Sequence, residues 1–318
     1  MRRSVLAVLS PSWLSSPLLA LSFLAACSSS PASGGGPSDD VPFGSPDGGG
    51  FGDPADGGGG GKLPECAEET KDIFVITEEN TLYSFHPPTL AFKSIGRIQC
   101  PTGGATPTSM AVDRFGAAWI RHSDGLLWKV NTRTLDCELT NFSPTAQSEP
   151  FFKFGMGFST SSKGGSNEQL FLSDNGGSGL AKLDLDSLKV NYVGGYTGEL
   201  SGRTSELTGT GDGKLYGFFV TAPAQIAEIS KGTGEIIRTT ELPNVYAGNA
   251  WAFSFYGGDF YIYTSSEGNG GGPPRAGGGS NVTRYRPSDG SIEVVKPKVG
   301  FKIVGAGVST CAPTEEPR

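Results

Sequence analysis

Between residues 72 and 309 the chain consists of short apolar runs, separated by turns rich in Gly, Asp, Ser and Pro. Some runs alternate apolar and polar positions, most cleanly where Ala181, Leu183 and Leu185 are interleaved with charged residues. Alternation of this kind places one side of an extended strand against a core. No long window has the 3.6-residue period of a helix. The pattern therefore predicts an all-β fold.

The runs recur in groups of four with a period of about 45 to 50 residues, and self-similarity at such a period is typical of repeat architectures. In the clearest copy, turns at 114–116 and 123–125 separate the first three strands. Its outermost segment is assigned to Thr132–Leu135 together with Cys137–Leu139. The complete copies are expected at 109–139, 154–193, 208–240 and 252–295.

A fifth copy begins one strand late, because only three strands fit between Asp72 and Ile98. The missing innermost strand is predicted at Lys302–Val308, near the other end of the chain. Radial repetition of this kind leaves only short, protected sheet edges, as in β-propellers. We therefore predict a β-propeller of five four-stranded blades, with the first blade closed by N- and C-terminal strands. A β-sandwich or an open multi-sheet domain is the alternative.

The segment Ala111–Trp119 reads Ala-Val-Asp-Arg-Phe-Gly-Ala-Ala-Trp. It resembles the repeats of bacterial β-propellers of the quinoprotein and streptogramin-lyase type, in which an inner strand ending Val-Asp-x-x-Gly leads into an aromatic-rich second strand. The resemblance covers most of residues 72–309 loosely and implies the propeller fold. Asp113 is expected to form a turn by binding backbone amides rather than to act as a catalytic group.

The first 26 residues have the pattern of an export signal. Arg2 and Arg3 precede a mostly apolar stretch, Leu6–Leu24, which is too short and too interrupted to span a bilayer. It ends in Leu24-Ala25-Ala26-Cys27, which resembles the lipobox of bacterial lipoproteins. That resemblance implies cleavage before Cys27 and its acylation, which would make membrane lipid a partner of the mature protein. An ordinary secretory signal is the alternative.

The residue after Cys27 is Ser28, and in lipoproteins of Gram-negative bacteria a residue other than Asp at this position implies transfer to the outer membrane. The predicted location is therefore the bacterial cell envelope. Residues 27–64 are rich in Gly, Pro and Ser and predict a lipidated, disordered linker, with a root-mean-square span of roughly 30–36 Å. The propeller is assigned to 65–313 and a disordered tail to 314–318.

Four cysteines remain besides Cys27, and an even number in an exported chain predicts two disulfides among three possible pairings. In the five-bladed arrangement Cys66 precedes the second strand of the first blade and Cys311 follows its innermost strand. We therefore predict a Cys66–Cys311 disulfide and, by remainder, Cys100–Cys137. No close Cys-x-x-Cys pair is present, and no metal site is predicted.

Charge and motif content restrict the function. With 25 Lys and Arg against 32 Asp and Glu, the net charge is −7, which argues against a nucleic-acid partner. Two histidines, His86 and His122, are too few for a site with several imidazole ligands. The chain has neither a phosphate-binding loop nor a nucleophile elbow, so we predict no cofactor.

One face of the propeller is expected to collect ligand-binding side chains from the loops between second and third strands and between blades. The principal candidates are His122, Asp124, Asp174, Arg203, Glu206 and Trp251, and the same face would gather Glu78, Glu79, Asn175, Tyr246, Asn249 and Glu267. We predict a binding or scaffold domain with a protein or glycan partner. The alternative is a glycan-active hydrolase or lyase that uses carboxylates in the propeller funnel.

Overall fold

The described part of the chain is built almost entirely from short β-strands. The computed structural model describes residues 66, 68–145, 149–265 and 279–316. All of them belong to one of the two units into which the chain divides, Phe51–Arg318. The predicted signal segment and linker, including Cys27, lie outside the described residues, as does Glu267. Within the described ranges, no helix is long and apolar enough to cross a membrane.

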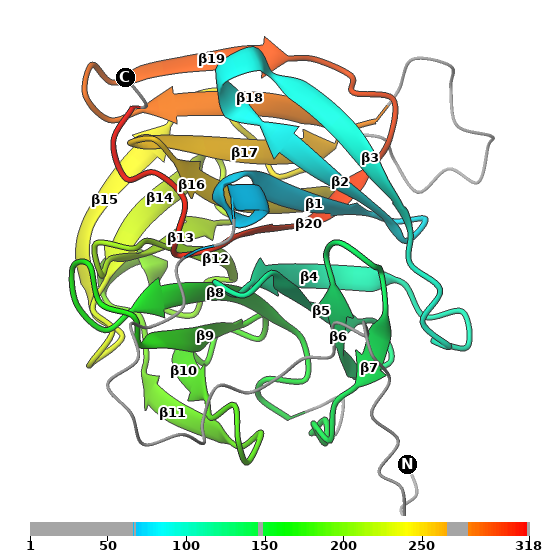
Figure 1. Cartoon of the computed structure of the whole chain (residues 1–318). Helices are drawn as coiled ribbons and strands as arrows, with labels where there is room; N and C mark the ends of the chain where they lie inside the picture. The colour runs from blue at the N-terminus through cyan, green and yellow to red at the C-terminus, as the bar shows by residue number, and fades with distance from the viewer. Residues whose placement is uncertain (1–65, 67, 146–148, 266–278, 317–318) are drawn as a thin grey trace, which may run out of the picture. The chain divides into compact units, whose positions relative to one another are not determined.

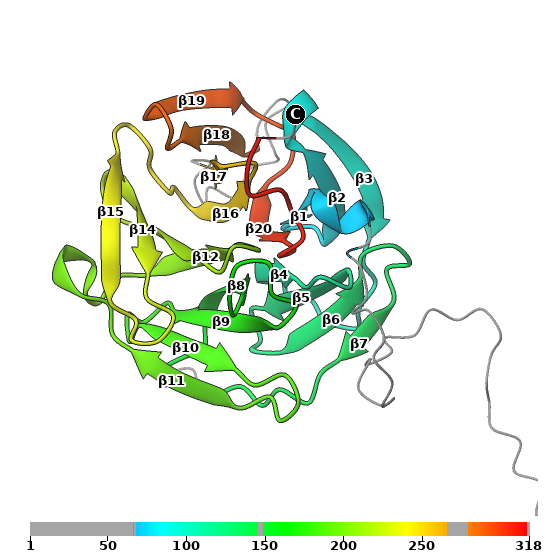
Figure 2. The same cartoon turned by 60° about the vertical axis from the view of Figure 1, so that its left-hand side comes forward.

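The strands form five separate four-stranded antiparallel sheets arranged around a ring (Figure 2). The five-bladed β-propeller predicted from the repeats is confirmed. From the innermost to the outermost strand, blade 1 consists of β20 (Ile303–Val308), β1 (Ile73–Thr77), β2 (Thr81–His86) and β3 (Ala91–Arg97), and blade 2 of β4 (Pro107–Val112), β5 (Ala117–His122), β6 (Leu127–Asn131) and β7 (Cys137–Leu139). Blade 3 consists of β8 (Phe154–Thr160), β9 (Glu168–Asp174), β10 (Leu180–Leu183) and β11 (Val190–Gly194), blade 4 of β12 (Ser205–Gly209), β13 (Leu215–Phe219), β14 (Ala224–Ile229) and β15 (Ile236–Leu242), and blade 5 of β16 (Ala250–Tyr256), β17 (Asp259–Ser265), β18 (Asn281–Arg286) and β19 (Ser291–Lys296). The helical elements are single 3-10 turns at η1 (Glu68–Lys71), η2 (Pro87–Thr89) and η3 (Gly198–Leu200).

Blade 1 is completed by strands that are far apart in the sequence. β20 pairs with β1 in antiparallel register, with Ile73 opposite Val308 and Val75 opposite Ala306. Figure 1 shows red β20 beside blue β1. The predicted closure of the first blade by both ends of the propeller sequence is therefore confirmed.

Both predicted disulfides are present. Cys66 and Cys311 lie with their Cα atoms 5.7 Å apart, and Cys100 and Cys137 with theirs 5.5 Å apart. The first bond joins the chain before β1 to the chain after β20, so it closes the ring covalently. The second joins the β3–β4 connection to β7 and so links blade 1 to blade 2.

The hydrophobic core is divided among the junctions between neighbouring blades, each with its own cluster of buried side chains. In β1, Phe74 and Ile76 pack toward blade 2, whereas Ile73 and Val75 pack toward blade 5. Because both sides of an inner strand are buried, these strands read as continuous apolar runs in the sequence. The outermost strands β3, β11, β15 and β19 are largely exposed or half-buried.

Glycines let the innermost strands approach one another closely. A Cβ atom on Gly155 in β8 would stand 2.5 Å from the carbonyl oxygen of Ser205 in β12. On Gly307 in β20 it would stand 2.8 Å from the backbone nitrogen of Val112 in β4. Neither position has room for a side chain. The close approach brings polar groups of different blades together around the ring axis.

Two local predictions are wrong. Thr132–Leu135 forms the turn between β6 and β7 rather than a strand, because the Asn131 side chain accepts hydrogen bonds from the backbone of Arg133 and Thr134. Leu185, interpreted as a buried position of an alternating strand, is 36% exposed because β10 ends at Leu183.

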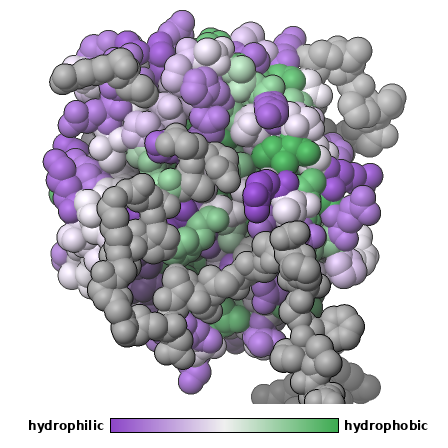
Figure 3. Space-filling view, in the orientation of Figure 1, coloured by the Kyte–Doolittle hydropathy of each residue, from purple (hydrophilic) through white to green (hydrophobic). Residues whose placement is uncertain are grey.

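The surface is mostly hydrophilic on the side shown in Figure 3, where the apolar patches are small and separate. Tyr192, Ile237 and Val294 are large apolar residues that are more than half exposed, and each lies on the outermost strand of a different blade. Scattered exposure of this kind is normal on a protein surface and does not by itself mark an interface.

Candidate functional site

The ring has two faces with different loops. We call the face where the innermost strands begin the upper face and the face where they end the lower face. Because the blades are antiparallel, the loops between second and third strands also lie on the upper face. The six principal ligand candidates lie at or near this upper face, in blades 2 to 5.

His122 ends β5 and is buried. Its Nε2 lies 3.4 Å from Oδ1 of Asn80 in blade 1, whereas its Nδ1 has no hydrogen-bond partner. Burial lowers the pKa of this imidazole, so His122 is neutral at pH 7. Asp124 is exposed, and its carboxylate accepts a hydrogen bond from the backbone N–H of Leu126. His122 thus belongs to the junction of blades 1 and 2, and Asp124 to a turn.

Asp174 ends β9 and is also buried. Its two carboxylate oxygens accept backbone hydrogen bonds from Phe151, at 2.8 Å, and from Ser178, at 3.0 Å. Phe151 has a φ of +61°, a left-handed conformation that is uncommon for a bulky residue. The neighbouring Asn175 is exposed. Asp174 therefore holds the connection between blades 2 and 3 against blade 3.

Glu206 lies at the centre of the ring. Its Oε1 accepts hydrogen bonds from the Ser109 hydroxyl of blade 2, at 2.5 Å, and from the Met156 N–H of blade 3, at 3.1 Å. Glu206 belongs to blade 4, so one carboxyl group connects three innermost strands. Burial raises the pKa of Glu206 to about 8, which leaves the group mainly protonated at pH 7. The inner strands of three blades are thus joined by a neutral, hydrogen-bonded acid.

The other predicted residues do not converge on Glu206. Arg203 is exposed, and Trp251 is half-buried against the core between blades 4 and 5. No hydrogen bond or ion pair joins any two of the six principal candidates, all of which lie within the described ranges. Of the remaining residues, Glu78 pairs with Lys302 at 3.2 Å, Glu79 and Tyr246 are exposed, and Asn249 donates a backbone hydrogen bond to Ser265.

Arg121 is a charged residue that the sequence reasoning missed. It is fully buried between the rings of Phe152 and Phe154, each with its centre 5.2 Å from the guanidinium carbon. The guanidinium donates hydrogen bonds to the carbonyl oxygens of His122 and Phe152. No carboxylate of the described ranges forms an ion pair with it, although Asp124 acts on it electrostatically. Burial lowers the pKa of Arg121 to about 10, so it remains charged at pH 7. Its one sequence signal is a charge near the end of the otherwise apolar β5, followed by His122.

The lower face carries two acids with a raised pKa, of which Asp113 is buried and Glu168 is half-buried. Asp113 accepts hydrogen bonds from the backbone N–H groups of Phe115 and Ala117 and from Nε1 of Trp119, which agrees with its expected role in a turn. Burial raises the pKa of Asp113 despite these bonds. Oδ1 thus has its donors in the turn and at the start of β5, and Oδ2 has its donor in the Trp119 side chain of β5.

Glu168, the half-buried acid, was missed by the sequence reasoning. It begins β9 and accepts hydrogen bonds from the Arg114 N–H of blade 2, at 2.9 Å, and from the Thr310 hydroxyl next to Cys311, at 2.7 Å. Burial raises the pKa of Glu168 to about 7, and repulsion from Asp113 adds to the rise. The carboxyl group connects two blades with the segment that follows β20.

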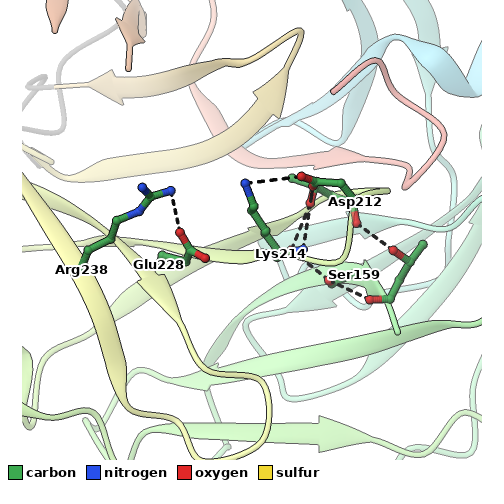
Figure 4. Close-up of polar contacts among 7 residues, drawn as sticks. Ser159, Asp212, Lys214, Glu228 and Arg238 are labelled. Atoms are coloured by element: carbon green, nitrogen blue, oxygen red, sulfur yellow. Dashed lines mark hydrogen bonds and ion pairs between the residues drawn. The ribbon is translucent and has the colours of Figure 1, made fainter. Parts of the chain in front are cut away.

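Blade 4 carries two separate groups of polar contacts, one of which reaches the neighbouring blade (Figure 4). Lys214 lies 3.4 Å from Asp212, and Arg238 lies 2.6 Å from Glu228. Ser159 of blade 3 donates a hydrogen bond to the Lys214 carbonyl oxygen at 2.9 Å. Because Lys214 and Arg238 are exposed, these ion pairs contribute little stability. Among the described residues no group of three or more His, Cys, Asp and Glu side chains is placed to hold a metal ion.

Comparison with known proteins identifies no family for this chain. No protein-family model matches the chain, and no curated protein matches it. The structure is similar to a chain in a nidogen–laminin complex, with a TM-score of 0.46 and 10% identity over 74% of this chain and 97% of that chain. It is also similar to luciferin-regenerating enzyme, with a TM-score of 0.43 and 12% identity over 79% and 94% of the two chains. A protein of unknown function from Bacteroides caccae has a TM-score of 0.43 and 12% identity over 74% and 97%. These similarities concern the fold alone, and no ligand follows from them.

Proposed function

We propose that this chain is a lipid-anchored protein of the bacterial cell envelope that displays its propeller as a binding or scaffold domain. The observation that carries the proposal is the segment Leu24-Ala25-Ala26-Cys27 at the end of an apolar stretch. Two disulfides support it, because such bonds form and persist in exported proteins. Two or more acyl chains on Cys27 would anchor the protein stably. Ser28 favours the outer membrane as the final location.

The contents of the ring support binding over catalysis. A glycoside hydrolase needs one carboxyl group as an acid and a second as a base or nucleophile, both open to the substrate. Glu206 is buried and hydrogen-bonded to groups of two other blades. Asp113 and Glu168 interact with each other electrostatically; Asp113 is buried, Glu168 is half-buried, and both accept hydrogen bonds from the protein itself. All three carboxyl groups are thus engaged by other groups of the protein. The alternative of a glycan-active hydrolase or lyase has no such observation in its favour.

Fatty-acid labelling tests the anchor. The full-length chain and its Cys27→Ala variant are expressed in a Gram-negative host that is supplied with labelled palmitate. We expect label on the unchanged protein and on a Ser29→Ala control, and none on Cys27→Ala. Equal label on Cys27→Ala would overturn the proposal. Membrane fractionation of the labelled protein then tests the outer-membrane location.

A further inference from the structure

A pocket opens on the upper face at the junction of blades 2 and 3. Its volume is about 310 Å³, near the lower limit of the roughly 300–1,000 Å³ typical of small-ligand sites. One wall is the end of the connection from blade 2, and the other is the turn between β9 and β10. The lining residues are Glu149, Pro150, Phe152 and Lys153 on the first wall, and Asp174, Asn175, Gly176 and Ser178 on the second.

The first wall is held by two buried charged residues. Asp174 accepts a hydrogen bond from the N–H of Phe151, and Arg121 donates one to the carbonyl oxygen of Phe152. The dipeptide Phe151-Phe152 is therefore fixed from opposite sides by a carboxylate and a guanidinium. The left-handed backbone of Phe151 persists because these contacts hold it.

The two walls are also joined to each other and to blade 4. The Asn175 N–H donates a hydrogen bond to the Lys153 carbonyl oxygen at 2.9 Å. The Thr204 hydroxyl donates one to the Asn175 carbonyl oxygen at 2.7 Å. These bonds use backbone groups of Lys153 and Asn175 and leave their side chains open to the pocket. A pocket with fixed walls binds a ligand without the cost of ordering them.

The first wall contains two energetically unfavourable features, the buried Arg121 guanidinium and the left-handed Phe151, which indicate a function other than folding. A buried guanidinium without a carboxylate partner is unfavourable, and so is a left-handed bulky residue. Residues held in such conformations concentrate at sites that hold ligands. The pocket adjoins both features, because Asp174 and Phe152 line it directly.

The polar side chains around the pocket include both charged and neutral groups. Glu149, Lys153, Asn175 and Ser178 line it. Among the described residues, none of their side chains has a hydrogen-bond or ion-pair partner. Together they offer acceptors and donors in similar number, which matches a ligand whose every hydroxyl both donates and accepts. The volume suits one or two six-membered rings. We propose that this pocket binds a neutral sugar of one or two residues.

The proposal deepens the proposed function, because it names the ligand class of a domain already inferred to bind. Full-length protein in detergent micelles is titrated with glucose, galactose, mannose, N-acetylglucosamine and cellobiose, and ligand-observed NMR reports binding. Diglycine serves as a zwitterionic probe of similar size. We expect at least one sugar to bind and diglycine not to bind.

Variants then place the site. Lys153→Ala and Asn175→Ala should each weaken sugar binding about tenfold or more, since each removes hydrogen bonds to the ligand. Lys163→Ala is the control, because Lys163 is exposed and lies on the lower face, and its affinity should be unchanged. No binding by any of the sugars, binding of diglycine alone, or equal affinity in all variants would overturn the proposal. The labelling of Cys27 is independent of these results, so a failed sugar titration leaves the anchor standing.

Discussion

Replacing Glu206 with Gln tests whether the acid at the centre of the ring is neutral in the folded protein. Gln has nearly the shape of a protonated Glu, and its Oε1 can accept the same hydrogen bonds from Ser109 and Met156. It differs from Glu in that it never ionises. Glu206→Gln therefore removes the titration while it keeps the contacts.

The magnitude follows from the two pKa values. Burial raises the pKa of Glu206 from 4.5 to about 8 in the folded protein. A raised pKa stabilises the fold fully below pH 4.5, and this stabilisation is lost as the pH rises toward 8. By pH 7 the loss amounts to about 3 kcal/mol, at 1.36 kcal/mol per pH unit. Glu206→Gln escapes this loss, so it should be more stable than the unchanged protein at pH 7 and equally stable at pH 4.

Thermal unfolding of both proteins between pH 4 and pH 8, with disulfides intact, measures the effect. For a domain of this size, about 3 kcal/mol corresponds to a rise in Tm of roughly 6–12 °C at pH 7. The same substitution at Glu199, which is exposed, is the control and should not change the pH profile. Parallel profiles for Glu206→Gln and the unchanged protein, or a less stable Glu206→Gln at pH 8, would refute the reasoning.

Three further predictions concern closure and packing of the ring. Gly155→Ala should lower the free energy of unfolding by about 1–3 kcal/mol, because the added Cβ atom would clash with the backbone of β12. Gly232→Ala is the control: its Cβ atom would have no other atom within 4 Å, so the free energy of unfolding should change little. Urea denaturation of the two variants measures the difference. The double variant Cys66→Ser, Cys311→Ser removes a cross-link between residues 245 positions apart, so its free energy of unfolding should fall by about 5 kcal/mol in the same assay. An unchanged urea midpoint would show that the disulfide does not stabilise the ring. Burial raises the pKa of Glu168 to about 7, so the unchanged protein should lose stability between pH 4.5 and 7. Glu168→Gln cannot ionise, and its stability should therefore depend less on pH in this range. A pH dependence as steep as that of the unchanged protein would contradict this.

Much of the fold could be predicted from the sequence because turns and apolar runs are local signals. The inner strand Phe154–Thr160 was predicted with the bounds that the structure has. The role of β20 followed from a count, since the first repeat lacked one strand and the end of the chain supplied one. The disulfide between Cys66 and Cys311 then followed from the same geometry.

The candidate site could be predicted only as far as the face on which it lies. Glu206 was placed on the upper face, but its contacts with Ser109 and Met156 depend on how closely three blades approach at the axis, which no local pattern reports. Arg121 was missed because a charged residue in a strand normally indicates exposure. Here two Phe rings and carbonyl oxygens cover it.

The way in which the ring closes also bears on where the proposed binding site lies. Gly155 and Gly307 bring neighbouring inner strands so close that no side chain fits between them. At the axis, Oε1 of Glu206 accepts hydrogen bonds from two other inner strands, so this atom is already occupied by donors of the protein. At the upper end of the junction of blades 2 and 3, Phe151 and Phe152 are buried, and Arg121 and Asp174 bind their backbone next to the pocket. Oε1 of Glu206 at the axis is already bound to the protein, whereas the proposed sugar pocket is lined by side chains of a connection between blades.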